Sequence, residues 1–568
     1  MSYVPSEDLP KMSTGETGDI FHLRTKDTST RSASITVTDD DDDMVFMAQP
    51  TSRGPIREAD SIVDTVPKGR FVAGEAFFNY AAFGSLREGL PSVMLLTPQY
   101  IGLALNAIIA GFIVTFSSYA LQPLLVAVLT RYQPDQIKAA EKLVQWPGTL
   151  AVFVGLFSDC FPLFGYRRKS YIMVGWIFSA IMYFCMSVID YTMDKTDSSI
   201  GYLYLLTSIL ANVGYQVMWT ASLAMTVEFA QREHLYERGH LQSLYFILHF
   251  TASGLTHIVC SFVIHPQDDE SLRSDVSLGE AGLILGGVCL IPLPFLYWML
   301  LEEYAPSSRV SLAGRLAELW NFLQQKVVYC IFFYLVVTIF LISAQDPSVQ
   351  TAVSLWCGIT PSDSQWVNLA VNSPKLLGVL FFKTFFINVD WRKIGAFGLL
   401  FFVACNLSLT LPVAAGDMRH TWYYFMWMAL AQIPQGFYEL FIVIPATEIA
   451  DVGREGITIG LISSFMALIS IAGTTLWDSL NNGVGIDISV EAIVMDASRV
   501  HRDVTVATIV YSVIQLLAIA MFWFLPAQKL DAQQLRAFGG YNRIARLTIL
   551  CVFLALLIYD LVSNLANW

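Results

Sequence analysis

Two charged residues inside long apolar stretches are the first feature of this 568-residue sequence that could do chemistry. Lys375 lies roughly nine residues into one apolar run, which corresponds to ~13 Å at the helical rise of 1.5 Å per residue. Glu439 lies in another, next to Pro434 and Gly436. Because an unpaired cation is costly in hydrocarbon, we expect Lys375 to pair with Glu439 or with an anionic ligand. A purely structural pair is the alternative.

Other polar side chains in the apolar runs could complete a binding site for a small, flat, hydrogen-bonding solute. They are Asn106, Asn212, Gln216, Trp219 and Gln435. His249 and His257 could titrate near neutral pH and relay protons, although a lone histidine on an apolar helix is more often a packing residue. We expect Glu439 and His249 to carry any proton coupling.

A second group of residues surrounds a short basic turn. Asp159 ends one apolar run, Gly165 follows, and three consecutive cations, Arg167 to Lys169, precede the next run. An acid that faces such a turn or a helix N-terminus can hold one conformation closed. The alternative is an anchor that merely follows the positive-inside rule.

We expect Glu228 and Glu448 to add ion pairs to this gate, close to Arg232 and Arg454. The full set of predicted gate residues is Asp159, Gly165, Arg167, Arg168, Glu228, Arg232, Glu448 and Arg454.

The composition indicates how these residues are positioned. Hydrophobic residues make up 55% of the chain and charged residues only 14%, which is too apolar for a soluble globular protein. The apolar runs have about the ~20 residues that cross ~30 Å of hydrocarbon as a helix. We therefore predict an all-α polytopic membrane protein with spans near 99–130, 143–163, 170–190, 200–230, 240–264, 278–301, 327–345, 366–388, 394–414, 421–448, 456–478 and 503–525.

A weak internal repeat divides these spans into two six-helix halves. The fourth span ends in Thr226-Val-Glu228-Phe-Ala230 and the tenth in Ala446-Thr-Glu448-Ile-Ala450, each followed by an Arg and then a Gly. Duplicated halves are common in transporters. The predicted organisation is a disordered acidic Ser/Thr-rich tail (1–70), an amphipathic lead-in at the membrane interface (71–98), two halves (99–301 and 327–525), an inter-half loop (302–326) and a basic linker with an extra hydrophobic segment (526–568).

The basic residues suggest an orientation. Loops on the side of Arg167 carry more cations than those on the other side, which places the N-terminus in the cytoplasm. The last run, 547–561, could span the membrane, enter it partway or lie along its surface. We expect a multi-pass protein of the plasma membrane or an organelle membrane.

Several functions are excluded or not supported by the sequence. The net charge of −13 comes without a basic stripe, so no nucleic-acid partner is expected. No phosphate-cradling Gly-rich loop or zinc spacing occurs, and the 8 cysteines form no Cys/His pattern. We expect no enzymatic activity, no metal and no cofactor.

The stretch Gly155-Leu-Phe-Ser-Asp159-Cys-Phe-Pro162-Leu-Phe-Gly165-Tyr-Arg167-Arg168-Lys-Ser-Tyr171 resembles the signature of the folate-biopterin transporter family, a branch of the major facilitator superfamily. Gly239-His-Leu241-Gln242-Ser243 and Leu96-Thr97-Pro98 resemble two further segments of that family. The similarity is dense over residues 96–260 and thin in the second half.

This resemblance implies a fold of the major facilitator type and folate or pterin as the solute. From the two halves and the intramembrane acids, we expect a symporter that works by alternating access and is coupled to protons. The sequence departs from the family pattern before Gly155, where Gln145-Trp146-Pro147 and the following residues lack the usual lysine. A carrier for a different polar or anionic solute is one alternative. A receptor or scaffold that transports nothing is the other.

Overall fold

The computed structural model describes residues 84–87, 89–129, 134–193, 200–266, 272–304, 312–484 and 490–567. All of them lie in one unit, Gly54–Trp568. The predicted disordered tail (1–70) lies outside the described residues, as does part of the lead-in. The described part of the lead-in, up to residue 98, contains no helix.

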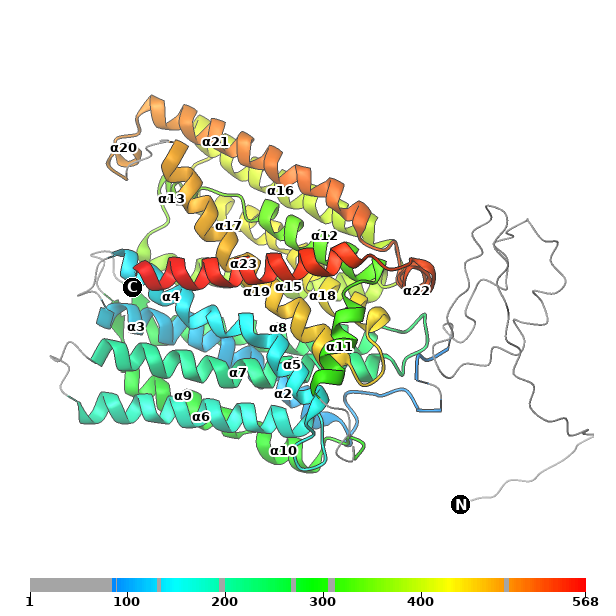
Figure 1. The fold of residues 1–568 in the computed structure, drawn as a ribbon. Coiled ribbons are helices and arrows are strands. Elements are labelled where there is room, and N and C mark those ends of the chain that lie inside the picture. The colour runs from blue at the N-terminus through cyan, green and yellow to red at the C-terminus, as the bar shows by residue number, and fades with distance from the viewer. Residues whose placement is uncertain are drawn as a thin grey trace, which may run out of the picture. The chain divides into compact units, whose positions relative to one another are not determined.

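Long helices that lie side by side make up the fold (Figure 1). The first half consists of α2 (Ile101–Phe116), the π-helical turn η3 (Ser117–Leu121), α3 (Gln122–Val128), α4 (Pro134–Gln145), the 3₁₀ turn η5 (Trp146–Leu150), α5 (Ala151–Cys160), α6 (Lys169–Thr192), α7 (Ile200–Ala230), α8 (His240–Val263), α9 (Leu278–Leu290) and α10 (Pro292–Trp298). A short hairpin of β1 (Ile264–Pro266) and β2 (Leu272–Ser274) joins α8 to α9.

The second half follows the same plan. It consists of α12 (Lys326–Ile342), α13 (Pro347–Trp356), the 3₁₀ turn η6 (Pro361–Asp363), α14 (Ser364–Asn372), α15 (Lys375–Phe381), the π-helical turn η7 (Phe382–Phe386), α16 (Trp391–Ala415), α17 (Thr421–Gln432), α18 (Gln435–Ile449), α19 (Glu455–Val484), α20 (Val490–Val494), α21 (Ser498–Leu517) and the 3₁₀ turn η8 (Ala518–Phe524). Outside the two halves lie α11 (Leu312–Phe322), α22 (Lys529–Phe538) and α23 (Arg543–Asn567).

The predicted fold class is confirmed. Among the described residues, 11 helices are long and apolar enough to cross a membrane, and the pair α12 and α13, bent by 46°, raises the number to 12. The 31-residue α7 carries several polar residues and is not one of these, although it packs against α5, α6, α8 and α19. Each expected span contains a helix, because only a helix satisfies the backbone of a single segment in hydrocarbon.

Helix ends gather at two faces of the bundle. One face, called here the Asp159 face, holds the end of α5, the start of α6, and the helices α11 and α22 (Figure 1). The opposite face holds α20 and the last residues of α23 (Figure 1). The start of α19 in the second half meets the end of α5 at the Asp159 face.

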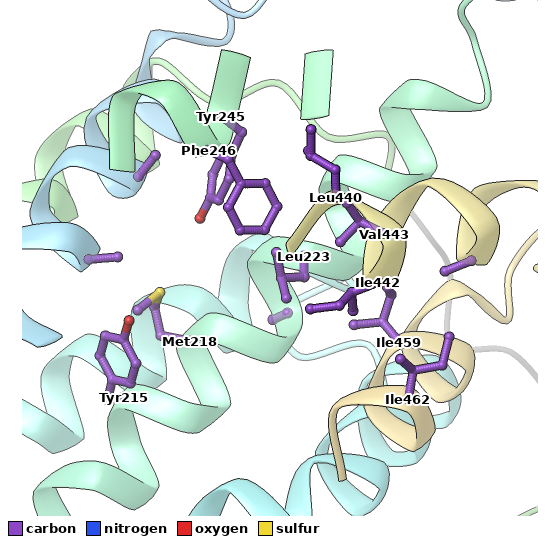
Figure 2. Packing of buried hydrophobic residues seen from close by; sticks show 14 of the residues in the cluster. Tyr215, Met218, Leu223, Tyr245, Phe246, Leu440, Ile442, Val443, Ile459 and Ile462 are labelled. Atoms are coloured by element: carbon purple, nitrogen blue, oxygen red, sulfur yellow. The ribbon is translucent and has the colours of Figure 1, made fainter. Parts of the chain in front are cut away.

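The two halves also share an apolar core. Figure 2 shows Leu223 of α7 beside Ile442 of α18, with Phe246 of α8 and Ile459 of α19 in the same cluster. Leu223 is 3% exposed and Ile459 is 0% exposed. This packing holds the inner helices of the halves together in the conformation described.

The last hydrophobic run forms the 25-residue helix α23, which packs against α4, α12 and α19. It lies along the same direction as the long helices of the bundle (Figure 1). Of the three arrangements considered from the sequence, a full crossing agrees best with this geometry.

A crossing by α23 has a consequence for topology. A tag fused after Trp568 should be on the opposite side of the membrane from a tag inserted in the connection between α10 and α11, residues 305–311. Protease protection in sealed vesicles of uniform orientation measures this. Cleavage of both tags from the same side would contradict a spanning α23.

Candidate functional site

Asp159 ends α5 and contacts the first turn of α19 in the other half. Its Oδ2 accepts a hydrogen bond from the backbone N–H of Ile457 at 2.7 Å, and its Oδ1 accepts one from Gly456 at 3.3 Å. These N–H groups have no partner within α19, and the helix dipole favours an anion beside them. Both contacts expected of Asp159, with a helix N-terminus and with the basic turn, are present.

Arg168 provides the contact with the basic turn. Its guanidinium donates to Asp159 at 2.5 Å and to Glu455 Oε2 at 3.3 Å, and it lies 4.0 Å from Glu228. The side chain is 0% exposed. We call Arg87, Asp159, Arg168, Glu228 and Glu455 the Asp159 cluster. Its members come from both halves and from the segment before the first span.

Small residues allow the two halves to approach here. A Cβ at Gly155 of α5 would overlap the carbonyl of Gly456, and a Cβ at Gly460 would lie 2.5 Å from the carbonyl of Ala151. The turn itself needs Gly165, which has a φ of +81° and packs against the ring of Tyr304. Gly155 of the sequence motif, together with Gly456 and Gly460, is therefore required for the close contact between α5 and α19.

The other cations of the turn have different positions. Glu302 accepts the backbone N–H groups of Arg167 and Arg168 at 2.9 Å each and that of Lys169 at 2.7 Å, and so satisfies the N-terminus of α6. Lys169 donates to the carbonyls of Tyr297 and Leu300. The Arg167 guanidinium lies beside Gly453.

Glu448 belongs to a separate group of charges on the same face. Arg238 donates to Glu448 Oε2 at 2.9 Å, and both side chains are 0% exposed. Gln533 of α22 donates to the same carboxylate at 2.5 Å, and Arg536 of α22 forms an ion pair with Asp451. The helix α22 thereby contacts the end of α18.

The predicted pairing of Arg232 and Arg454 with these glutamates is wrong. Arg232 forms an ion pair with Glu303 at 3.4 Å, and Arg454 pairs with Asp451 at 2.9 Å and with Glu318 of α11 at 3.2 Å. Adjacency in sequence suggested the pairing, but Glu228 and Glu448 pair with Arg87 and Arg238, which are distant from them in sequence.

Two titratable groups near α22 have shifted pKa values. Burial raises the pKa of Glu233 to about 7, although the N–H groups of Gly239 and Leu241 donate to it and oppose the shift. Burial lowers the pKa of Lys529 to about 8, against the opposing effect of Glu448. Lys529 donates to the carbonyl of Leu235 and to Asn388, which joins a loop of each half.

A second candidate site lies inside the bundle, around Lys375. The helix breaks between α14 and α15, and Lys375 begins α15 directly after Pro374. Its Nζ donates to Asn372 at 3.2 Å, and Asn372 donates to the hydroxyl of Tyr119 in the other half at 2.9 Å. The ring of Tyr119 lies 4.5 Å from that of His257 on α8. Tyr119 sits in the π-helical turn η3, a feature often found at functional sites.

Glu439 and the two histidines lie within the electrostatic range of Lys375. The charge of Lys375 acts on Glu439, His249 and His257. No ion pair between Lys375 and Glu439 forms among the described residues, where Lys375 donates to Asn372 instead. We call Lys375, Asn372, Tyr119, His257 and Glu439 the Lys375 cluster.

His257 is the least satisfied member of this cluster. It is 1% exposed, and neither of its ring nitrogens has a hydrogen-bond partner among the described residues. The Nδ1 of His249 also lacks one there, and its ring lies 5.0 Å from that of Trp219. Buried polar groups without partners are expensive, so a polar ligand or water between the halves would stabilise this arrangement.

The remaining predicted ligands are dispersed. Asn106 is 0% exposed, accepts from Trp176 and donates to Ser222 and Tyr245 in the core of the first half, which leaves it no capacity for a solute. Asn212 donates to the carbonyl of Val144. Gln216 donates to Thr220 at 3.3 Å, and Gln435 begins α18.

Sequence reasoning missed Arg87, Glu455, Tyr119 and Asn372 as members of the two clusters, and it named His257 as a possible proton relay but not as a neighbour of Lys375. Glu455 had a usable signal, because it begins the eleventh span directly before a glycine. Asn372 lies one helical turn before Lys375 and could have been named by its spacing. Nothing in the local sequence identifies Arg87.

Comparisons with known proteins agree with the motif. Residues 110–271 match the model of the BT1 family. A folate-biopterin transporter of Synechocystis sp. is 36% identical over 98 residues, which are 17% of this chain and 18% of that relative. The chain thus matches less than a fifth of the relative's length. The resemblance to the folate-biopterin transporter family is confirmed for this part of the chain.

Solved structures support the fold. The human organic anion transporter MFSD10 (TETRAN) superposes with a TM-score of 0.51 at 12% identity over 75% of this chain and 99% of that one. A D-xylose-proton symporter superposes with a TM-score of 0.50 at 14% identity over 76% and 98% of the two chains. The fold is therefore of the major facilitator type, with two six-helix halves and the added helix α23.

The shifted pKa of Glu233 predicts a pH dependence of stability. Its native pKa of about 7 lies above the ordinary 4.5, so the native state binds the proton more tightly than the unfolded state. The contribution of Glu233 to stability should therefore rise as the pH falls from about 7 to about 4.5. Thermal unfolding in detergent across this range should show the difference in Tm between the wild type and Glu233→Gln change with pH in that direction. A pH-independent difference would contradict the shifted pKa.

Proposed function

We propose that this chain is a secondary carrier that moves a small polar or anionic organic solute across a membrane by alternating access. The observation that carries the proposal is the Lys375 cluster, a cation with unsatisfied polar neighbours inside the bundle and contributed by both halves. Intramembrane charges at the contact between two halves are typical of transport pathways.

The Asp159 cluster supplies the second part of the mechanism. When α5 lies against α19, Asp159 neutralises the N-terminus of α19 and Arg168 neutralises the carboxylates. Opening this face separates α5 from α19 and exposes these charges to water, which solvates them. The buried contacts therefore favour one conformation without making the other inaccessible.

Lys375 favours a solute with negative charge or strong acceptors. A carboxylate or an enolised ring could replace Asn372 as the partner of Nζ, while Tyr119 and His257 offer a hydroxyl and ring nitrogens. Folate and pterins have such groups, and the relative from Synechocystis sp. is named for them. These compounds are the first candidates.

A different solute of the same chemical class is the second candidate. The family model ends at residue 271, whereas Lys375 and Glu439 lie in the second half. The likeness therefore covers α5, α6 and the turn between them, together with Tyr119 and His257 of the Lys375 cluster, but not Lys375, Asn372 or Glu439.

Proton coupling would use Glu439 with His249, which lie within the electrostatic range of Lys375. A proton on Glu439 would leave Lys375 as the sole charge and favour an anionic solute. The Asp159 face would be cytoplasmic, because cations gather there. They are Arg167 in the turn before α6, Lys169 at the start of α6, and Lys529 and Arg536 of α22.

Uptake into proteoliposomes tests this proposal. Radiolabelled folate, biopterin and an amino acid should be compared with and without an inward proton gradient. In Lys375→Gln, the KM of the transported solute should rise roughly 10- to 100-fold, the effect of losing a charge-assisted hydrogen bond of about 1.5–3 kcal/mol.

Lys393→Gln is the matched control, since the Lys393 side chain is 81% exposed and pairs only loosely with Asp390. It should leave the KM unchanged. An unaltered KM in Lys375→Gln would contradict the proposed binding site, and no uptake of any organic anion or polar solute by folded wild-type protein would contradict the carrier.

A further inference from the structure

Arg87, which precedes the first span, occupies the middle of the Asp159 cluster. It lies outside any helix, yet its side chain is only 10% exposed. Its Nη1 donates to Glu228 at 3.0 Å, its Nε donates to Gln231 Oε1 at 3.0 Å, and its Nη2 donates to Glu455. One guanidinium thus uses all three of its nitrogens on acceptors, of which Gln231 and Glu455 are buried and Glu228 is partly buried.

These acceptors belong to different halves. Glu228 and Gln231 lie at the end of α7 in the first half, while Glu455 is the first residue of α19 in the second. Gln231 itself donates to the carbonyl of Ala450 in the second half at 3.0 Å. Arg87 therefore bridges the two halves at the point where opening of this face must separate them.

The backbone around Arg87 is fixed to the same region. The N–H groups of Leu86 and Arg87 donate to the carbonyl of Gln231 at 2.9 and 3.3 Å, and Arg238 donates to the carbonyl of Gly84 at 2.9 Å. The described residues just before the first span therefore lie against the end of α7 and the loop between α7 and α8.

The charges explain why an additional cation is needed. Three carboxylates, Asp159, Glu228 and Glu455, meet here with Arg168 as the other cation of the cluster. Glu302, the next carboxylate, is bound by backbone N–H groups at the start of α6. Without Arg87, Arg168 alone would face these three carboxylates, two of which, Asp159 and Glu455, are only 1% exposed, and this excess of negative charge is strongly unfavourable.

We propose that Arg87 is a gate residue supplied by the chain ahead of the first span, and that the Asp159 face opens only when its guanidinium leaves Glu455 or Glu228. Arg87 then positions the carboxylates of both halves and does not contact the solute. This inference rests on the proposed function only in taking the opening of the Asp159 face to be a step of transport. The segment before the first span is thereby coupled to the conformational equilibrium.

Labelling of Cys160 tests the inference without any solute. Cys160 is 3% exposed, follows Asp159 and packs against Ile457 of α19. In a chain that keeps Cys160 as its single cysteine, reconstituted in nanodiscs, the rate of modification by a water-soluble maleimide reports separation of α5 from α19. Arg87→Gln should raise this rate at least tenfold. Arg87→Lys, which keeps the charge but not the three-nitrogen geometry, should give an intermediate rate.

Two further variants separate charge from packing. Arg87→Gln combined with Glu228→Gln restores the wild-type charge balance and should return the rate towards the wild-type value. Arg392→Gln is the control, because Arg392 is on the same face but lies outside the Asp159 cluster, and its side chain donates to the carbonyl of Leu525 and lies beside Trp523 and Asp531. It should label as the wild type does.

A wild-type rate in folded Arg87→Gln would overturn the proposal, as would an increase that the double variant fails to reverse. If Arg87→Gln does not fold, the order of rates among wild type, Arg87→Lys and the double variant decides, and equal rates in all three overturn it. Uptake assays are read separately. Faster labelling with no uptake of any solute would refute the carrier and leave the role of Arg87 intact.

Discussion

The contact between the Asp159 carboxylate and the first backbone N–H groups of α19 is the interaction on which the rest of the structure depends. It requires α5 and α19 to touch, and they touch because Gly155 and Gly456 have no side chains between them. Arg168 then lies within reach of Glu455, and Arg87 can bridge Glu455 to Glu228. Separating the two helices would break the ion pairs that Arg168 and Arg87 make with Glu455.

Such a cluster is suited to a conformational equilibrium. Buried ion pairs gain little net free energy, because the cost of desolvating the charges offsets their attraction. The charges regain water when the halves separate, so the closed and open states can have similar free energies. Removing one partner of an ion pair in the closed state is costly, however, since it leaves the other partner as a buried, uncompensated charge. The cluster therefore specifies which surfaces meet more than it stabilises the protein.

The chain ahead of the first span and the helix α22 extend this control. Arg87 enters the Asp159 cluster, while α22 contacts Glu448 and Asp451 and, through Lys529, the loop that carries Leu235. Both segments flank the membrane spans in sequence and meet both halves at one face. Inside the bundle, Asn372 and Tyr119 connect the halves beside Lys375. Closure at the face and the geometry around Lys375 thus involve the same relative position of the halves.

Much of this could be predicted from the sequence, and the rest depends on long-range packing. The spans and the link from Asp159 to Arg168 follow from local patterns, because hydrocarbon thickness fixes helix length and nine residues separate the two charges. Glu228 and Glu448 were found by their repeat. Their partners could not be predicted, since Arg87 and Arg238 reach these glutamates only after the loops fold.

The position of Lys375 within an apolar run could be read from the sequence. Its hydrogen bond with Asn372, where an ion pair with Glu439 was expected, could not, because the helix breaks at Pro374. Asn106 was predicted to bind solute because the sequence cannot show that its side chain already forms hydrogen bonds with Trp176 and Ser222.

Alternating access requires that the Asp159 face and the opposite face open in turn. Distances between spin labels in nanodiscs test it most directly, with one pair at the exposed positions Tyr236 and Val452 on the Asp159 face and the other at the exposed positions Tyr202 and Met418 on the opposite face. Asp159→Asn weakens the contact with α19, so the account predicts a longer distance in the first pair together with a shorter one in the second. Unchanged distances in both pairs, or an increase in both, would contradict alternating access.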